Sequence, residues 1–360
     1  MSSEASRVLA SRRFGTAGLY LRTDVSIPCH TCDEDLDDDA KFCGMCGAIL
    51  VDENFERVLG DRYVVRQRIG AGSLGAVYRG VQRTTRRKVA LKLLADTGQR
   101  GPGAAERFVR EATVLMNLRS QHTISIYDFN REPDGTLYIV MEVSPGRSLA
   151  HVLQREGALP WTRVMRILLG LCDALGEAHT IGVIHRDLKP ENILLEERAT
   201  NQSFVKVSDF GLAKMLGTNL QISPVGQTVG AVEFASPESL LNRSVDARSD
   251  LYALGVLAYL LISGVHPFHS ARSFGDMIAA HVQQTAAPLR SLRPDVPDDV
   301  DALVATLMQK NPDHRYPDAA TVAAQLSLLM TGFPPEPGMT VRTDEGEEDT
   351  FLAEIPSRPK

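Results

Sequence analysis

The sequence predicts an α+β fold in which a sheet-rich part precedes a helical part, behind a short cysteine-rich segment. Three observations predict it. From Tyr63 onward, "YVVRQRIG", "AVYRGVQR" and "KVALKLL" have the β-branched and aromatic content of strands. After Gly146, "TRVMRILLGLCDALGEAHTIG" repeats its apolar residues at helical spacing. Four of the five cysteines lie between residues 29 and 47.

Length and charge narrow the class of protein. A chain of 360 residues is long enough for more than one core. A net charge of -6 argues against a general nucleic-acid binder, which usually carries a basic stripe. The longest uncharged run, "LYALGVLAYLLISGV", is shorter than the ~20 apolar residues that a membrane helix needs, so it predicts a buried core helix. The first apolar patch is short and is followed by Arg12 and Arg13, so we expect no secretory leader, no membrane partner and a cytoplasmic protein.

The cysteines form two C-x-x-C pairs. Cys29 and Cys32 make the first, and Cys43 and Cys46 make the second after ten intervening residues. Disulfides, a redox switch and a metal site are the alternatives; structural disulfides are rare in the cytosol. Two such pairs can complete a tetrahedral site of four thiolates, so the segment resembles a short zinc ribbon. Structural Zn²⁺ would supply folding energy that so small a segment lacks. A redox role stays open, because zinc thiolates oxidise.

The composition also suggests where the chain divides. We expect a flexible arm (1–28), the zinc ribbon (29–50), a charged linker (51–62), the main domain (63–330) and a disordered Pro-rich, then acidic, tail (331–360). The residues between the two cysteine pairs are strongly acidic, which would repel a phosphate backbone and counts against a nucleic-acid sensor. These residues form either a solvated loop or a module that docks onto another protein. The second alternative implies a protein partner for the ribbon, and the acidic tail could bind such a partner as well.

A glycine-rich stretch opens the main domain. "GAGSLGAV" is followed by the strand pattern "AVYRGVQ", whereas a dinucleotide-binding loop would require a helix at this point. A glycine loop between two strands instead folds over phosphates, with its backbone N–H groups close to the oxygens. We therefore assign nucleotide binding to Ile69, Gly70, Ala71, Gly72, Ser73, Leu74, Gly75, Ala76 and Val77.

A lysine and a carboxylate follow this loop. Lys92, in "VALK", lies on a strand fifteen residues after Val77 and can hold nucleotide phosphates as a point charge. Glu111, on the next predicted helix, can supply the carboxylate that fixes the position of Lys92.

The strongest motif is "IHRDLKPENILL". Asp187 is placed to accept a hydroxyl proton, and Lys189 would offset charge on a transferring phosphoryl group. Asn192 offers a side-chain oxygen to a metal, and "SDFGLA" adds Asp209, a hard ligand suited to Mg²⁺. Phosphoryl transfer requires this combination of a phosphate cradle, metal ions, a cation and an orienting carboxylate.

With these motifs in this order, the main domain resembles the protein kinase family, specifically the eukaryotic-like serine/threonine kinases of bacteria. The resemblance implies a bilobal fold, with ATP and Mg²⁺ (or Mn²⁺) between a small β-rich lobe and a large helical lobe, and protein substrates. It implies that Met141 is the gatekeeper and that the backbones of Glu142 and Ser144 face adenine. Ala90 and Leu194 would sandwich the base.

The resemblance also implies structural pairs. Glu238 of "ASPES" would pair with Arg315, and Asp250 would anchor the catalytic loop from the long core helix. Lys189 favours serine/threonine over tyrosine specificity.

The segment between the metal-binding motif and Glu238 contains the expected regulatory sites and one departure from the pattern of the family. Similar kinases phosphorylate themselves there, so we expect modification at Thr218, Ser223 or Thr228, with Arg186 receiving the phosphate. Ala231 stands where serine/threonine kinases usually carry a threonine that bridges the catalytic carboxylate and lysine. A nucleotide-binding pseudokinase scaffold is therefore the alternative, although every catalytic and metal-binding residue named above is present.

Overall fold

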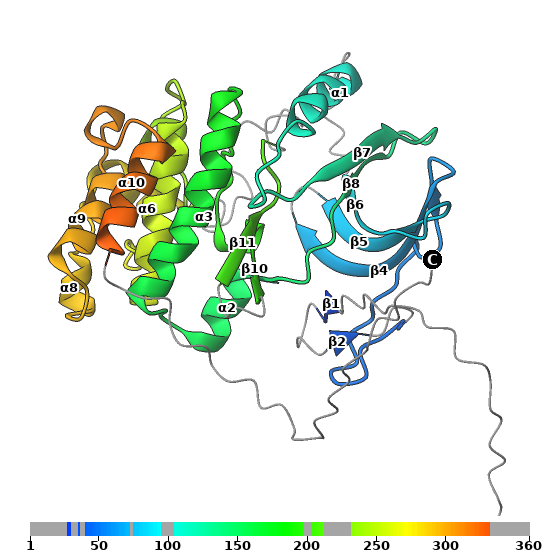
Figure 1. Cartoon of the computed structure of the whole chain (residues 1–360), viewed down its shortest axis with the longest axis horizontal. Coiled ribbons are helices and arrows are strands. Elements are labelled where there is room, and N and C mark those ends of the chain that lie inside the picture. The colour runs from blue at the N-terminus through cyan, green and yellow to red at the C-terminus, as the bar shows by residue number, and fades with distance from the viewer. Residues whose placement is uncertain are drawn as a thin grey trace, which may run out of the picture.

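The computed structural model describes residues 27–29, 35–36, 40–72, 75–94, 104–197, 203–211 and 232–331. These residues form a small lobe around a curled sheet and a larger helical lobe beside it (Figure 1). The predicted α+β, bilobal architecture is confirmed.

The small lobe is a six-stranded antiparallel sheet in the order β3-β4-β5-β6-β8-β7. Its elements are β3 (Val58–Leu59), β4 (Tyr63–Gly72), β5 (Gly75–Gln82), β6 (Lys88–Leu94), α1 (Ala104–Leu115), β7 (Ile126–Arg131) and β8 (Leu137–Met141). A Cβ at Gly80 of β5 would lie 2.3 Å from Leu91 Cδ1 and 2.9 Å from Val64 O, so only glycine fits there.

Residues 51–62, expected to be a charged linker, are built into this lobe. They contain β3, in which Leu59 is fully buried. Tyr78 on β5 donates a hydrogen bond from its hydroxyl to Asp52 Oδ2 (2.7 Å), and Gly60 N donates to Glu132 Oε1 (2.8 Å). Burial and then the bond to Asp52 raise the pKa of Tyr78 to about 12. The polar residues of the segment are therefore partners of the sheet.

The cysteine segment lies beside β4 (Figure 1). Its strands β1 (Ile27–Pro28) and β2 (Asp35–Leu36) pair antiparallel. A hairpin over residues 41–50 follows, closed by bonds from Cys43 N to Ala48 O and from Leu50 N to Lys41 O, both 2.9 Å.

The large lobe combines a short sheet with a set of helices. The strands, in the order β11-β10-β9, are β9 (Arg147–Ser148), β10 (Ile193–Glu197) and β11 (Ser203–Val207). The helices are α2 (Leu149–Glu156), α3 (Trp161–Thr180), η1 (Pro190–Asn192), α5 (Pro237–Leu240), α6 (Arg248–Ser263), α7 (Phe274–Gln283), α8 (Leu289–Leu292), α9 (Asp298–Leu307), η3 (Pro312–His314) and α10 (Ala319–Leu329).

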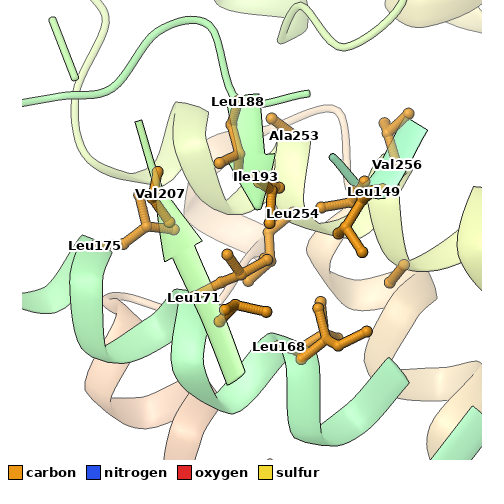
Figure 2. Packing of buried hydrophobic residues seen from close by; sticks show 14 of the residues in the cluster. Leu149, Leu168, Leu171, Leu175, Leu188, Ile193, Val207, Ala253, Leu254 and Val256 are labelled. Atoms are coloured by element: carbon orange, nitrogen blue, oxygen red, sulfur yellow. The ribbon is translucent and has the colours of Figure 1, made fainter. Parts of the chain in front are cut away.

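The core of this lobe lies between α3, α6 and the short sheet. Figure 2 shows Leu168 and Leu171 of α3 facing Ile193 of β10 and Leu254 of α6. Leu188, next to the predicted catalytic Asp187, is buried in the same cluster, so packing fixes the loop that carries the motif.

The long uncharged run corresponds to α6, which is buried along almost its whole length. This buried core helix is the one expected from its length and flanking residues. Among the described helices, none combines the length and apolarity required to cross a bilayer.

The predicted pair between Glu238 and Arg315 is present. Arg315 Nη1 and Nη2 donate to the two Glu238 carboxylate oxygens, each at 2.8 Å, and the Arg315 side chain is fully buried. Burial opposes ionisation of Glu238, but hydrogen bonds from Arg315 and Ser249 outweigh it and lower the pKa of Glu238 below its ordinary value. The pair ties α5 to the turn after η3.

Arg315→Met should therefore strand a buried carboxylate. We expect the free energy of unfolding to fall by about 3–5 kcal/mol, measured by chemical denaturation. Arg290→Met is the control, because its partner Asp298 is exposed, and it should cost less than about 1 kcal/mol. Because the pKa of Glu238 is lower in the folded state than in the unfolded state, its ionised carboxylate stabilises the fold at neutral pH. This stabilisation is lost on acidification. The difference between wild type and Arg315→Met should therefore shrink as the pH falls below about 4.3. Equal losses for the two variants would contradict this assignment.

Candidate active site

The catalytic loop is held by a buried carboxylate. Asp250, in the first turn of α6 and only 1% exposed, accepts hydrogen bonds from His185 N (2.8 Å) and Arg186 N (3.0 Å). The ring of His179 contacts the same carboxylate at 2.8 Å. Arg186 has a φ of 67°, a left-handed conformation that persists only where neighbours enforce it. The predicted anchoring role of Asp250 is confirmed by these bonds.

Asp187 sits in a cage of hydrogen bonds. Lys189 Nζ lies 2.9 and 2.8 Å from its two carboxylate oxygens. Asn192 Nδ2 donates to the main-chain oxygen of Asp187 (2.7 Å) and to its Oδ2 (3.0 Å). The Asp187 side chain keeps 36% of its surface exposed, so a substrate hydroxyl can reach it. The amide nitrogen of Asn192 faces Asp187, which leaves the amide oxygen, the predicted metal ligand, outside these two bonds.

An ion pair joins the two lobes. Lys92 Nζ on β6 lies 2.6 Å from Asp209 Oδ2, and the lysine side chain is only 5% exposed. Asp209 has a φ of 65°, which makes it a second residue in a left-handed conformation at this site. The structure thus brings together Lys92, predicted to bind phosphates, and Asp209, predicted to bind a metal ion. The side chain of Glu111 lies outside the described part of the molecule, so the expected pair between Glu111 and Lys92 stays a prediction.

The segment around Asp209, predicted to bind a metal ion, is coupled to the catalytic loop. The His185 ring packs on the ring of Phe210 with centroids 4.6 Å apart, and His185 Nε2 lies 2.9 Å from Ser208 O. Residues on both sides of Asp209 are therefore tied to the residue two positions before Asp187.

The glycine-rich stretch forms a hairpin between β4 and β5. Gly70 pairs with Val77, and Gly72 pairs with Gly75, whose φ of 138° requires glycine. β5 continues as a strand, so the rejection of a dinucleotide-binding loop is confirmed. Ser73 and Leu74, at the tip, lie outside the described residues.

The predicted adenine-binding residues lie at the junction of the lobes. Ala90 pairs with Met141 across β6 and β8, and both are buried in the core that also contacts Leu194 of β10. Glu142 N donates to Ser125 O (2.9 Å), and Ser144 Oγ donates to Glu196 Oε1 (2.8 Å).

Two residues that sequence reasoning missed hold this junction. Lys206 of β11 lies 2.8 Å from Glu142 Oε1, and Glu196 of β10 accepts the bond from Ser144. The sequence feature that could have identified Lys206 and Glu196 is a charged residue within each of the mainly apolar strands "ILLEE" and "SFVKV". The junction is thus fastened to the large lobe by side chains, not by its own backbone alone.

A small cavity of about 20 Å³ lies beside Met141, the predicted gatekeeper, and its size suits about one water molecule. Leu115, Leu118, Thr123, Ile124, Ile126, Ile139, Met141, Asp209 and Phe210 line it.

Two further groups are explained by their surroundings. Burial, followed by the charge of Glu191, raises the pKa of Glu233 above its ordinary value. Burial raises the pKa of Cys172 to about 12, which makes it the core thiol expected from its helix and not a nucleophile.

Ala231 and the three expected phosphorylation sites lie outside the described residues.

The cysteine segment gathers three thiols. The sulfur atoms of Cys29, Cys43 and Cys46 all lie within 4.8 Å of one another, and Cys29 and Cys46 are 3.7 Å apart. Sulfurs bound at about 2.3 Å to a tetrahedral zinc ion lie about 3.8 Å apart, so the spacing fits zinc. Cys32, the fourth predicted ligand, lies outside the described residues.

Known proteins are similar to this chain in sequence and in fold. The family described as "Protein kinase domain" matches residues 63–326. The serine/threonine-protein kinase pkn3 of Myxococcus xanthus is 37% identical over 77% of this chain and 52% of its own length. The serine/threonine-protein kinase PknB of Mycobacterium leprae is 34% identical over 77% of this chain and 44% of its own length. This chain thus spans about half the length of these relatives.

A solved structure gives the same fold. The PknI kinase domain of Mycobacterium tuberculosis has a TM-score of 0.60 with 24% identity, covering 76% of this chain and 98% of that one. At this identity the likeness is one of fold alone.

The anchor of the catalytic loop is testable by amide exchange. In Asp250→Asn one carboxylate oxygen becomes an NH₂ group, so the side chain can no longer accept from both His185 N and Arg186 N. The loss of about one hydrogen bond should speed exchange at these two amides roughly tenfold. Asp246→Asn, which alters a surface ion pair with Arg248, should leave their exchange unchanged. Protection that survives in Asp250→Asn would show that another group holds the loop.

Proposed function

This chain belongs to the protein kinase family, and on that premise we propose that it is an active serine/threonine kinase. It transfers the γ-phosphoryl group of ATP to hydroxyl groups of proteins and phosphorylates its own activation loop in signalling. The observation that carries the proposal is the hydrogen-bonded set of Asp187, Lys189 and Asn192, present in the same molecule as the Lys92–Asp209 pair.

Asp187 is the group that orients the substrate hydroxyl and accepts its proton. Its exposure allows the hydroxyl to approach, while Lys189 and Asn192 fix its two oxygens. Lys189, whose Nζ lies 2.8 Å from Asp187 Oδ2, would also offset charge on the transferring phosphoryl group. In the family, a lysine at this position accompanies serine/threonine specificity.

The nucleotide binds at the junction between the two lobes. The glycine hairpin covers the phosphates, Lys92 binds them as a cation, and Ala90, Met141 and Leu194 form the apolar adenine pocket. Asn192 and Asp209 would hold Mg²⁺, or Mn²⁺. That ion neutralises negative charge on the phosphates when bound.

A pseudokinase scaffold is the competing function, and Ala231 is the residue that favours it. Its missing hydroxyl would leave Asp187 less well oriented. The cage that Lys189 and Asn192 build around Asp187 supplies that orientation directly, which supports catalysis.

We further propose that Cys29, Cys32, Cys43 and Cys46 bind one structural Zn²⁺. The sulfur spacing and the small buried core of Cys29, Cys43 and Leu50 support it. Thiols remain reduced and available for zinc in the cytoplasm, where we place the protein. Its partners are protein substrates.

The kinase proposal predicts transfer that depends on Asp187. Wild type incubated with labelled ATP and Mg²⁺ should label itself or a generic protein substrate. Asp187→Ala should lose at least about a hundredfold in rate, because general-base residues contribute about 10²–10⁴-fold. Its nucleotide affinity should stay near that of wild type, since Lys92 and Asp209 are unchanged. Nucleotide binding by both proteins without transfer by either would favour the scaffold.

The zinc proposal predicts one zinc ion per chain by elemental analysis. Cys43→Ser should lose most of it, because serine is a poor zinc ligand, whereas Cys172→Ala should retain it. Purified protein without metal, or disulfides among the four cysteines in fresh lysate, would contradict the proposal.

A further inference from the structure

The cysteine segment is hydrogen-bonded directly to β4, the strand that carries the first half of the glycine-rich loop (Figure 1). Gln67 Nε2 donates to Ala40 O at 2.8 Å. Next to it, Arg68 N donates to Leu50 O at 2.7 Å. The two acceptors lie at the two ends of the hairpin that contains Cys43 and Cys46, so β4 is hydrogen-bonded to both ends of that hairpin.

Both β4 and the cysteine segment contribute buried residues to this contact. Gln67 is only 1% exposed, although its side chain is polar. Leu50 is fully buried and packs with Cys29 and Cys43 in a separate small core. A buried amide that loses its acceptor keeps the whole cost of its desolvation, so the contact resists opening while the hairpin is folded.

The strand departs from regular pairing at this contact. The register of β4 against β5 shifts between Val65 and Arg68, and again between Arg68 and Gly70. Irregularities of this kind re-aim backbone groups, and the N–H of Arg68 here points to Leu50. Regular pairing resumes at Gly70 and Val77, the start of the phosphate-binding hairpin. The glycine hairpin therefore follows directly from a stretch that depends on an acceptor outside the sheet.

We propose that the cysteine segment positions the glycine-rich loop for ATP, with Gln67 as the positioning residue, so that metal binding by the cysteines strengthens nucleotide binding. The inference rests on the proposed zinc site. The hairpin over residues 41–50 has only a minimal core of its own and needs its cysteines held together to stay folded. When the metal leaves, Ala40 and Leu50 are no longer held against β4, and the Gly70–Gly72 segment loses its fixed position.

The effect should fall on nucleotide binding and not on the chemical step. The contact lies in the small lobe, whereas Asp187 and its hydrogen-bond partners lie in the large lobe and are anchored by Asp250. Loss of the contact should raise KM for ATP and leave kcat nearly unchanged. A variant that merely destabilised the whole fold would lower the amount of active enzyme, and so kcat, without this split.

The decisive variant is Gln67→Met, which keeps the length and volume of the side chain but cannot donate to Ala40. We expect KM for ATP and Kd for Mg·ADP to rise about fivefold, the effect of losing about one hydrogen bond, with zinc content and kcat unchanged. Arg66→Met is the matched control. It places the same side chain at the neighbouring position, whose guanidinium pairs instead with Glu56 at 3.0 Å, and it should behave as wild type.

Metal removal tests the same link from the other end. Chelation of zinc from wild type should weaken Mg·ADP binding about fivefold or more, the lower end of usual coupling between sites. In Gln67→Met the same treatment should weaken it less, because one of the two bonds is already absent. Amide exchange across residues 66–72 should rise on chelation, while exchange at His185 and Arg186 should not.

The outcomes separate the proposals. If zinc is present but neither Gln67→Met nor chelation changes nucleotide affinity, the coupling is overturned and the zinc site stands. If the purified protein contains no zinc, the metal site and the coupling both fail. If nucleotide affinity follows zinc and Gln67 as expected but no phosphoryl transfer occurs, the coupling stands and the proposed catalytic function fails.

Discussion

The buried carboxylate of Asp250 is the constraint on which the rest of the site depends. It cannot be left unpaired in the core, and its donors are the backbone N–H groups of His185 and Arg186 and the ring of His179. It projects from α6, the helix around which the large lobe is packed. The position of Asp187, one residue after Arg186, is therefore set by the packing of the core and not by the loop's own preferences.

From this anchor the geometry extends to the other lobe. His185 packs on Phe210, next to Asp209, and Asp209 pairs with Lys92 on β6 of the small lobe. The route from the core helix to Lys92 thus consists of ring packing and charged hydrogen bonds between residues that are nearly all buried. Such contacts are stronger in a low-dielectric interior than at the surface, which keeps the parts needed for phosphoryl transfer in register.

The proximity of the proposed catalytic residues was predictable because they belong to one short motif. Asp187, Lys189 and Asn192 lie within a few residues of one another, so their proximity is nearly guaranteed. The role of Asp250 came only from the family resemblance, because nothing in its own neighbourhood names a partner. The fastening of Glu142 by Lys206 was missed, since a pair formed between distant strands depends on a register that the sequence pattern does not specify.

The attachment of the cysteine segment was missed for a related reason, although its signal was present. In "YVVRQRIG" the alternation that buries Tyr63 and Val65 places Gln67 in the same row. A polar side chain in a buried row requires a hydrogen-bond partner, and no position in the sheet pattern supplies one. The partner, Ala40 O, comes from a segment that looked independent because its cysteines implied a self-contained metal site. Gln67 is therefore the residue in the sequence that indicates that the cysteine segment packs against the small lobe.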